Sequence, residues 1–374
     1  MIEQSAIGLN SREEANPFLD DGMLPLITAP MNTVVNENNY KMFLENKINV
    51  CLPRNMDLNW VSENYTVSVS LDDFIKYYID ARAGMPFVNK GSVCIDTANG
   101  NMPKLHEAIR LAKQIHGDNL VIIAGNIGSV QAFVELASTG VDYIRVGIGG
   151  SAVCTTSIHT GVGENNLLSL VRICNNIRTN PNILIGAYNK NIIESFKNFS
   201  QTEKENISKV KIIADSTSRF IKDNNLHPNG YAGINQLLYA GADLVMLGNI
   251  FNKAYESAGE KYIEYSTGNF DKVKDAQVFL LGSSEEDIKS NYYRYGGLYS
   301  LYRGMSTQEE QQNYKKGELR HSEGKSVYNK VEYKLSEWIN GKKSDPDNYP
   351  GFINALKSAM SYTGSKTLKQ FKNT

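Results

Sequence analysis

Short apolar runs rich in β-branched residues recur along the chain, separated by longer amphipathic stretches. Most runs are continuously apolar rather than alternating, as expected for strands of a parallel sheet covered on its outer face. Eight such runs occur at 23–30, 48–53, 65–70, 92–97, 120–125, 143–148, 210–216 and 244–249. Eight strands alternating with helices over roughly 250 residues predict an α/β fold of the (β/α)8 TIM-barrel type, with a doubly wound open sheet as the alternative.

The stretches between these runs have the spacing and end signals of helices. Pro103 suits a first helical turn, and Ser129 is a candidate N-cap for a helix that stops at Gly140. A similar helical stretch, 231–243, precedes the eighth run. In the stretch 102–116 the apolar positions fall near one helical face, namely Leu105, Ile109, Ala112 and Ile115.

Three long segments do not fit the simple alternation of strand and helix. Residues 157–209 are predicted to be an insertion after the sixth strand, and the Tyr-rich residues 252–300 an insertion after the eighth. Residues 301–374 form a flap and C-terminal tail in this interpretation. We therefore expect a single barrel domain over 1–374, with these two insertions and a C-terminal extension.

Composition narrows the classes of partner. The chain has 39 basic and 40 acidic residues and a formal net charge of −1, which favours neither a nucleic-acid nor a membrane partner. We find neither an apolar run near 18 residues nor a signal peptide in the sequence. The four cysteines lack zinc-ligand spacing, so we expect a cytoplasmic protein with reduced thiols.

Barrel enzymes carry their chemistry at the carboxyl ends of the strands. Cys154 lies there, in a glycine- and hydroxyl-rich loop with few apolar neighbours, and this setting is typical of a reactive thiol. Cys51, Cys94 and Cys174 lie on or beside apolar runs, so we expect them to be structural. The other residues at these ends are Asn32, Arg54, Asp96, Asn99, Asn126, the loop 149–156, Asp215 and Gly248.

Eight short motifs follow one another in an order that resembles the IMP dehydrogenase/GMP reductase family of purine-nucleotide barrels. The loop 146–163, VGIGGSAVCTTSIHTGVG, is similar to the catalytic cysteine loop of that family. The other motifs are CIDTANG (94–100), IIAGNI (122–127), IADST (213–217), GADLVMLGN (241–249), YRGMS (302–306), EGK (323–325) and SYTGSKTL (361–368).

The resemblance implies an oxidoreductase that forms a covalent adduct. In such enzymes a thiolate, here that of Cys154, attacks C2 of the purine, and a nicotinamide cofactor gives or takes hydride at that carbon. Thr156 and Glu323 match the residues that would help the 2-amino group leave as ammonia. The expected cofactor is NADPH, with NADH or NAD as alternatives.

The same resemblance implies the binding residues. Asp215 would accept hydrogen bonds from the ribose hydroxyls, and Tyr302 would reach the phosphate. Asp96, Asn99, Gly100 and Gly324 would contact the cofactor, and the backbone of Gly149, Ser151 and Cys154 could hold a monovalent cation such as K⁺. The remaining substrate-binding residues would be Ser216, Thr217, Gly248, Asn249, Arg303, Gly304, Met305, Ser306 and Arg320.

Several motif positions depart from the family pattern. Asn32 replaces an aspartate, Ser151 replaces a glycine, and Ser216 and Thr217 replace paired glycines. Asn249 stands where the family has glycine or serine. Side chains therefore project where the family offers bare backbone to the phosphate, so a modified purine nucleotide is also a possible substrate.

Two features favour GMP reductase, which converts GMP to IMP, over IMP dehydrogenase, which converts IMP to XMP. The segment 54–70 is too short for the regulatory modules usual in dehydrogenases, and 306–322 is short and lacks their Arg-Tyr pair. The YRGM and SYTGSKTL motifs resemble dehydrogenases instead. Further alternatives are a non-catalytic nucleotide-binding barrel and a flavin enzyme, and the family resemblance implies a homotetramer.

Overall fold

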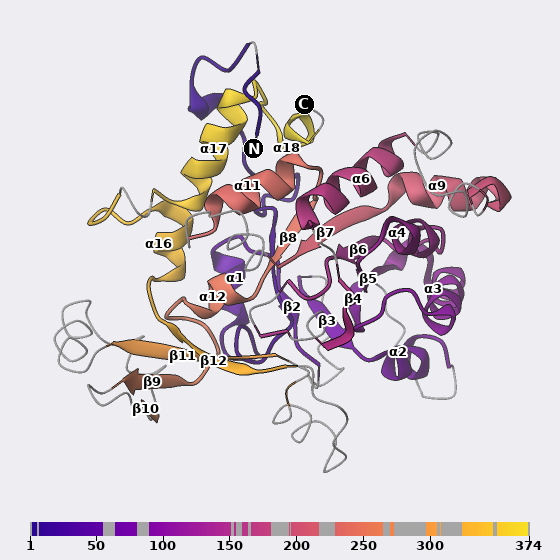
Figure 1. Cartoon of the computed structure of the whole chain (residues 1–374), viewed down its shortest axis with the longest axis horizontal. Coiled ribbons are helices and arrows are strands. Elements are labelled where there is room, and N and C mark those ends of the chain that lie inside the picture. Colours follow the sequence, from indigo (N-terminus) through magenta and orange to yellow (C-terminus); the bar gives the residue numbers. More distant parts are fainter. Residues whose placement is uncertain are drawn as a thin grey trace.

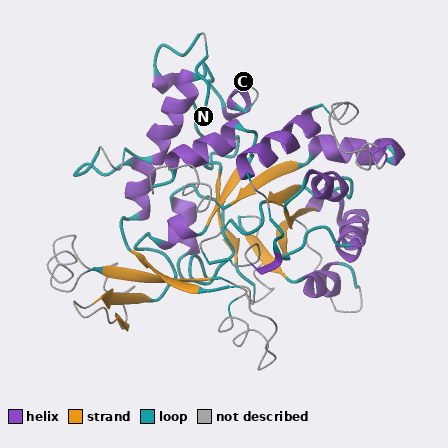
Figure 2. Cartoon of the chain, in the orientation of Figure 1, coloured by secondary structure: helices purple, strands orange, loops and turns teal. Residues whose placement is uncertain are grey.

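Eight parallel strands form the centre of the molecule (Figures 1 and 2). The computed structural model describes residues 2–5, 7–54, 64–80, 90–150, 153–154, 159–163, 166–180, 194, 196–216, 229–264, 270–272, 297–304, 307, 324–346 and 350–372. The eight strands are β1 (Leu26–Thr28), β2 (Cys51–Leu52), β3 (Thr66–Val69), β4 (Gly91–Asp96), β5 (Leu120–Ile127), β6 (Tyr143–Val146), β7 (Lys211–Asp215) and β8 (Leu244–Leu247).

The sheet closes on itself. Its order is β1-β8-β7-β6-β5-β4-β3-β2, and the two end strands meet because Ile27 of β1 bridges Asn49, just before β2. Thr28 N donates to Asn49 O, and Asn49 N donates to Leu26 O, both at 3.0 Å. The predicted (β/α)8 TIM barrel is therefore confirmed, and each of the eight apolar runs overlaps one strand.

Helices surround the barrel (Figure 2). Ser129 accepts from Ala132 N, so the predicted cap is confirmed. Pro103 occupies the first turn of its helix, as predicted. The helices connecting the barrel strands are α1 (Tyr40–Glu45), α2 (Leu71–Tyr78), α3 (Pro103–His116), α4 (Val130–Ala137), α6 (Leu167–Thr179), α9 (Gln201–Lys209) and α11 (Tyr231–Tyr239), together with the 3-10 turn η4 (Gly117–Asn119); a first 3-10 turn, η1 (Arg12–Glu14), precedes β1.

The apolar face of α3 is narrower than the spacing suggested. Leu105, Ile109 and Ala112 are buried, but Ile115 is 56% exposed, so the buried part of this face does not extend to Ile115. At about 100° per residue, Ile115 lies about 80° around the helix from Leu105, at the edge of the apolar stripe. The chain turns away at Gly117, whose positive φ of 55° ends the helix.

A second, antiparallel sheet lies beside the barrel (Figure 1). Its strand order is β10-β9-β11-β12, and it combines strands of the predicted 252–300 insertion with strands of the predicted tail. The boundary drawn at 300/301 falls inside β11, and the single-domain assignment stays a prediction. The strands are β9 (Lys261–Glu264), β10 (Phe270–Lys272), β11 (Leu298–Arg303) and β12 (Ser326–Lys330).

The chain's last helices, α16 (Leu335–Asn340), α17 (Phe352–Tyr362) and α18 (Leu368–Phe371), pack on the barrel through an aromatic cluster. The ring of Trp338 stacks on Phe352, with centroids 5.4 Å apart, and contacts Tyr231 and Phe251 at 5.1 and 5.7 Å. Trp338 Nε1 donates to Asn229 O at 3.0 Å, which satisfies the polar atom of a fully buried ring. The tail is thus joined to α11 and to α12 (Asn249–Asn252).

A Gly-x-Asp sequence precedes both β6 and β8 and has the same function in each place. Asp142 Oδ2 accepts from Ile122 N, and Asp243 Oδ2 accepts from Ile212 N, each at 2.7 Å. Each carboxylate therefore satisfies a backbone N–H near the start of the preceding strand, Ile122 in β5 and Ile212 in β7.

Both aspartates also pair with cations from outside the strands. Lys113 of α3 lies 2.6 Å from Asp142, and Arg178 of α6 and Lys372 contact Asp243. Burial alone would raise the pKa of Asp243, but the charges of Lys372 and Arg178 outweigh it and lower that pKa. These pairs attach the helices and the C-terminus to the amino ends of the strands.

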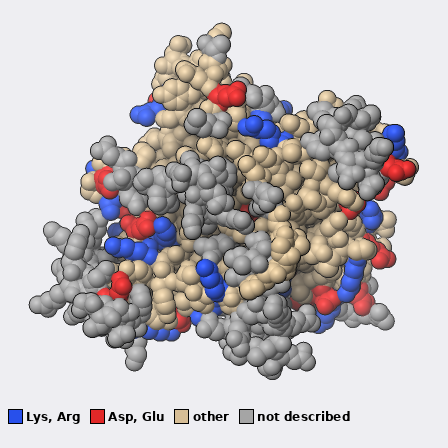
Figure 3. Space-filling model, in the orientation of Figure 1, with Lys and Arg blue, Asp and Glu red and all other residues tan. Residues whose placement is uncertain are grey.

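The described surface gives no indication of a dominant charge. On the face drawn in Figure 3, acidic and basic side chains are interspersed. Within the part of the chain that the structure describes, we find no helix long and apolar enough to cross a bilayer.

Lys261 is buried in the second sheet without a close ion-pair partner among the described residues. It is 2% exposed, and its Nζ donates to Ser257 O and Ser257 Oγ, both at 2.8 Å, and to Gly259 O at 2.9 Å. Burial lowers the pKa of Lys261 to about 7, because Glu256 alone favours the charged form. At neutral pH the amine therefore changes protonation state more readily than an exposed lysine.

This depressed pKa predicts a specific pH dependence of stability. Between pH 7 and 10.5 the unfolded chain binds a proton at Lys261 that the folded chain does not, so stability rises with pH in that window. The unfolding free energy of the wild type relative to Lys261→Met should rise by up to about 1.4 kcal/mol per pH unit. Urea denaturation at several pH values measures this difference. Lys272→Met, at an exposed position, is the control, and an equal slope for it would contradict the prediction.

Candidate active site

Charged side chains from three strands of the barrel, β4, β6 and β7, meet at the carboxyl ends of the strands. Arg145 of β6 points between Asp96 at the end of β4 and Asp215 at the end of β7. Its Nη1 lies 2.7 Å from Asp96 Oδ1, and its Nη2 lies 2.8 Å from Asp215 Oδ2. The Arg145 side chain is 8% exposed and each carboxylate 15%, so this is a largely buried charge network.

The network keeps Asp96 negatively charged and Arg145 positively charged. Burial alone would raise the pKa of Asp96, but Arg54 and Arg145 outweigh it and hold that pKa below its ordinary value. Burial would lower the pKa of Arg145, and the charges of Asp215, Cys94 and Asp96 instead raise it well above its ordinary value. Arg54 Nη2 lies 3.0 Å from Asp96 Oδ2. The mouth of the barrel therefore contains fixed charges of both signs at neutral pH.

The carboxylate of Asp215 is held through one oxygen. Its Oδ2 accepts from Arg145 Nε at 3.2 Å and Nη2 at 2.8 Å, and from Asn126 Nδ2 at 2.5 Å. Among the described residues, we find no donor to Oδ1. The orientation of the group is thus fixed while one oxygen can still accept hydrogen bonds from a ligand.

The loop that leads to Cys154 begins in close contact with β7. A Cβ on Gly147 would lie 2.8 Å from Asp215 O, so only glycine fits there. Ser216 has a left-handed backbone, with φ of 75°, and its Oγ donates to Gly150 O at 2.7 Å. This conformation costs a non-glycine residue roughly 1–2 kcal/mol. Ser216 thus keeps the backbone shape of a glycine and adds a hydrogen bond that fastens the loop.

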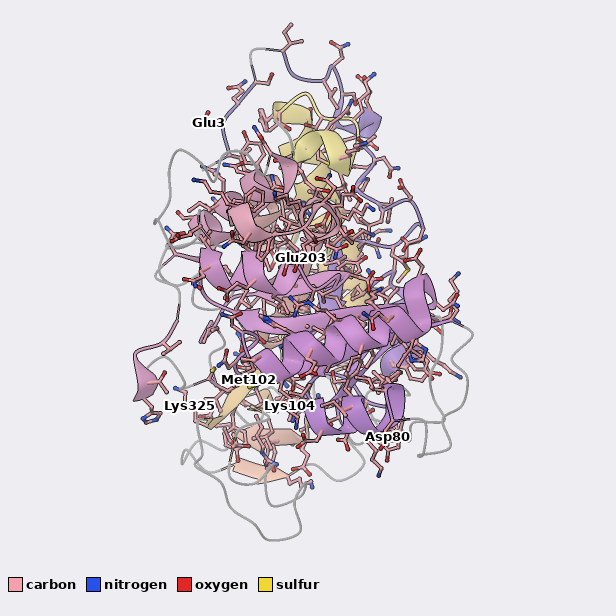
Figure 4. The ribbon with its side chains drawn as sticks, turned by 90° about the vertical axis from the view of Figure 1, so that its right-hand side faces the viewer. Glu3, Asp80, Met102, Lys104, Glu203 and Lys325 are labelled. Carbon is pink, nitrogen blue, oxygen red and sulfur yellow. The ribbon has the colours of Figure 1, made fainter. Side chains whose placement is uncertain are left out.

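Cys154 itself pairs with a segment far along the chain. It forms an antiparallel bridge with Gly324, and Lys325 N donates to Val153 O at 3.0 Å. Gly304 also lies here, since a Cβ on it would be 3.3 Å from Val153 Cγ2. Met102, the residue before α3, and Lys325 both lie on the left-hand side of the view in Figure 4.

Cys154 differs from the other three cysteines in exposure. Its side chain is half-buried, whereas Cys51, Cys94 and Cys174 are buried, as expected for structural thiols. Burial raises the pKa of Cys174, which keeps that thiol protonated. Of the four thiols, only Cys154 therefore combines access to solvent with a place at the barrel mouth.

The end of β8 is covered by Tyr302 of β11. A Cβ on Gly248 would lie 2.5 Å from the Tyr302 hydroxyl, so the tyrosine requires glycine at that position. Tyr302 is 1% exposed, and its hydroxyl also lies 3.5 Å from Met31 Sδ. Asn249, the next residue, directs its Oδ1 to Asn329 Nδ2 at 2.9 Å.

The turn after β4 also requires glycine. Gly100 N donates to Asn126 O at 2.8 Å, and a Cβ on Gly100 would lie 2.7 Å from Gly125 Cα. Thr97 Oγ1 donates to Asn99 O at 3.0 Å, which shapes the same turn. The turn therefore lies directly against β5, next to the charge network.

Comparison with known proteins agrees with this architecture. A family model for the IMP dehydrogenase / GMP reductase domain matches residues 86–187, which include Cys154. The chain is 25% identical to a GMP reductase of Staphylococcus epidermidis, over 97% of this chain and 90% of that protein. GMP reductases of Mesoplasma florum and Helicobacter pylori (strain G27) are 26% and 24% identical over 97% of this chain, covering 91% and 90% of those proteins.

The chain is thus similar to the IMP dehydrogenase / GMP reductase domain over residues 86–187, and to GMP reductases at about 25% identity over nearly its whole length. The resemblance drawn from the sequence motifs is thereby confirmed. The catalytic and binding roles given to individual residues stay predictions.

The structure brings many of the predicted family residues to one end of the barrel. Asp96, Gly100, Asp215, Ser216, Gly248 and Tyr302 lie at the ends of β4, β7 and β8, and Cys154 pairs with Gly324. Gly149, Asn99, Asn249, Arg303 and Gly304 are described on the adjoining segments. Ser151, Thr156, Thr217, Met305, Ser306, Arg320 and Glu323 lie outside the described residues.

Sequence reasoning missed Arg145. Arg54 was predicted to lie at a strand end, but no function was predicted for it. The run 143–148 was predicted only to be a strand. The available signal was a charged residue inside an apolar run, between Ile144 and Val146, both of which are fully buried. A buried arginine requires partners of opposite charge, and Asp96 and Asp215 were already among the expected strand-end residues.

Removal of the Arg145 charge should destabilise the folded protein. Arg145→Gln leaves Asp96 and Asp215 without their shared cation, and should lower the unfolding free energy by roughly 3–5 kcal/mol in urea denaturation. Arg110→Gln is the matched control, because its 3.8 Å pair with Glu203 is partly exposed and should contribute less than about 1 kcal/mol. Equal losses in the two variants would show that the network contributes no special stability.

Proposed function

We propose that this oxidoreductase is an NADPH-dependent GMP reductase that converts GMP to IMP through a covalent adduct at Cys154. The observation that carries the proposal is the pairing of Cys154 with Gly324 at the mouth of the barrel. Glu323, the expected proton donor, immediately precedes Gly324 in the sequence. The three curated relatives described above are named GMP reductases, which supports the same reaction.

In this reaction the Cys154 thiolate adds to C2 of the guanine ring. The 2-amino group takes a proton, with help from Glu323 and Thr156, and leaves as ammonia when its C–N bond breaks. C2 then accepts a hydride, and the C–S bond breaks to release IMP and regenerate the thiolate. NADPH, when bound, supplies that hydride.

The nucleotide's sugar and phosphate are proposed to bind at the ends of β7 and β8. The carboxylate of Asp215 is fixed through Oδ2, so its Oδ1 is available to accept from the ribose hydroxyls. Ser216, Thr217, Gly248, Asn249 and Tyr302 would surround the phosphate. The residues proposed to contact the base are Arg303, Gly304, Met305, Ser306 and Arg320.

The residues at the end of β4 fit a nicotinamide cofactor. Each carboxylate oxygen of Asp96 accepts one arginine N–H and keeps a lone pair for a hydroxyl. Arg54 Nε is buried and has no hydrogen-bond partner among the described residues, so it can donate to a polar group of a ligand. Asp96, Asn99, Gly100 and Gly324 would hold the cofactor in this proposal, and K⁺ would bind the backbone of Gly149, Ser151 and Cys154.

The decisive assay mixes the purified protein with GMP and NADPH and follows the absorbance of reduced nicotinamide. Cys154→Ala should abolish turnover and leave GMP binding largely intact in calorimetry, because sugar and phosphate contacts remain. Cys174→Ala, which removes a buried thiol, should keep turnover. Wild-type protein that reacts with IMP and NAD and leaves GMP unchanged would instead be an IMP dehydrogenase. Nucleotide binding without either reaction would indicate a non-catalytic barrel.

Glu323 should matter for deamination. The 2-amino group is a poor leaving group unless it is protonated, and general acid assistance is worth about 10²–10⁴-fold. Glu323→Gln should therefore lower the rate of GMP reduction by at least about 10²-fold with little change in GMP binding. Rapid-mixing kinetics measure the rate, with the exposed Glu107→Gln as control. A variant as fast as wild type would remove Glu323 from the mechanism.

A further inference from the structure

Three asparagines join the second sheet to the end of β8. Asn329 of β12 donates through its Nδ2 to Asn249 Oδ1 at 2.9 Å and to Asn252 Oδ1 at 2.8 Å. Asn249 begins α12 and Asn252 ends it, so both hydrogen atoms of one amide are used on one short helix. We call Asn249, Asn252 and Asn329 the asparagine cluster.

Hydrogen bonding fixes which way these amides face. Asn252 is fully buried, and its Nδ2 donates to Thr33 O at 2.8 Å and Leu301 O at 3.0 Å, both of which can only accept. Its Oδ1 must therefore face Asn329, whose amide is oriented in turn with Nδ2 toward α12. Asn249 then accepts through Oδ1.

The amide of Asn249 is left with an unused donor group. Its Nδ2 has no acceptor among the described residues, and the residue is half-buried beside Gly248 and the Tyr302 hydroxyl. An NH₂ group in this place is complementary to an acceptor such as a phosphate oxygen. The asparagine that replaces the family's glycine or serine thus presents a donor, and Asn329 determines that orientation.

The same strand also reaches the thiol. β12 begins two residues after Gly324, which pairs with Cys154, and Lys325 N donates to Val153 O at 3.0 Å. On its other side β12 pairs with β11, with Arg303 opposite Ser326 and Tyr302 opposite Val327. A displacement of β12 at Asn329 would therefore be transmitted to the Cys154 pairing.

We propose that Asn329 is a positioning residue for the nucleotide site, acting through Asn249 at the phosphate end and through β12 at Cys154. The phosphate part of this inference rests on the proposed function. The Cys154 part depends only on the fold. The cluster thereby links the two ends of the nucleotide site through a strand of the second sheet.

The first test measures the rate at which iodoacetamide alkylates Cys154 in the unliganded protein, by peptide mass spectrometry. Asn329→Ala should raise this rate roughly fivefold, the equivalent of about one lost hydrogen bond in the pairing of Cys154. Asn249→Ser, whose side chain is too short to reach Asn329, should raise it as well, and the double variant should add little. Asn354→Ala, whose side chain bonds Pro350 O at the exposed start of α17, is the control.

The second test measures the GMP concentration that half-protects Cys154 from iodoacetamide. Asn329→Asp places a carboxylate opposite two amide oxygens. Asn252 cannot turn, so Asn249 should turn its Oδ1 toward the phosphate. The half-protecting concentration should therefore rise in the order wild type, Asn329→Ala, Asn329→Asp. If Asn329 only stabilised the fold, Asn329→Ala and Asn329→Asp proteins of equal thermal stability would have equal half-protecting GMP concentrations.

The outcomes separate this inference from the proposed function. Alkylation of Asn329→Ala at the wild-type rate would overturn the inference even if the wild type reduces GMP. Faster alkylation would support the Cys154 part even if the wild type neither binds nor reduces GMP, which would refute the proposed function. Equal half-protecting concentrations in the wild type and Asn329→Asp would overturn the phosphate part.

Discussion

The guanidinium of Arg145, buried between Asp96 and Asp215, is the interaction on which the mouth of the barrel depends. Each carboxylate lies at the end of a different strand, so one cation fixes the spacing between β4 and β7, which are separated in the sheet by β5 and β6. A buried ion pair of this kind adds little stability by itself, but loss of one partner leaves uncompensated charge. The network therefore acts as a constraint on geometry, which a site with several ligand contacts requires.

The position of the loop that leads to Cys154 depends on this network. Asp215 is fixed by Arg145 and Asn126, and the residue after it, Ser216, holds the carbonyl of Gly150. The loop then continues to Cys154, whose backbone pairs with Gly324. The loop that carries this half-buried thiol is thus held at two points. Gly150 is bonded to the barrel, and Cys154 pairs with the segment that leads into the second sheet. Such support keeps a nucleophile near one geometry without burying it.

The structure gives a physical reason for two of the departures from the family motifs. Ser216 adopts the left-handed backbone that glycine adopts without strain, and its hydroxyl is used to fasten the loop. Asn249 is part of a hydrogen-bonded cluster that reaches β12. Both replacements add side-chain contacts where the family offers bare backbone. They need not remove donors from the site, because a hydroxyl and an amide can both donate.

The sequence by itself determined the barrel, one helix cap and which cysteines are buried, because each of these follows from local spacing and side-chain type. Each of the eight apolar runs overlaps a strand, and Ser129 caps the helix assigned to it. The motif order also pointed to Cys154. These features are local, or repeat along the chain, so one sequence is enough to read them.

Only the tertiary structure decided which polar groups meet. Arg145 is one residue in an apolar run until the folded barrel places it between two carboxylates. The second sheet pairs β9 with β11 across more than thirty residues of sequence, and Cys154 pairs with Gly324 across a longer interval. The amide of Asn329 could have faced water, and only its contacts with Asn249 and Asn252 give it an orientation. Long-range pairing and hydrogen-bond direction depend on groups that are distant in the chain, and local pattern does not encode them.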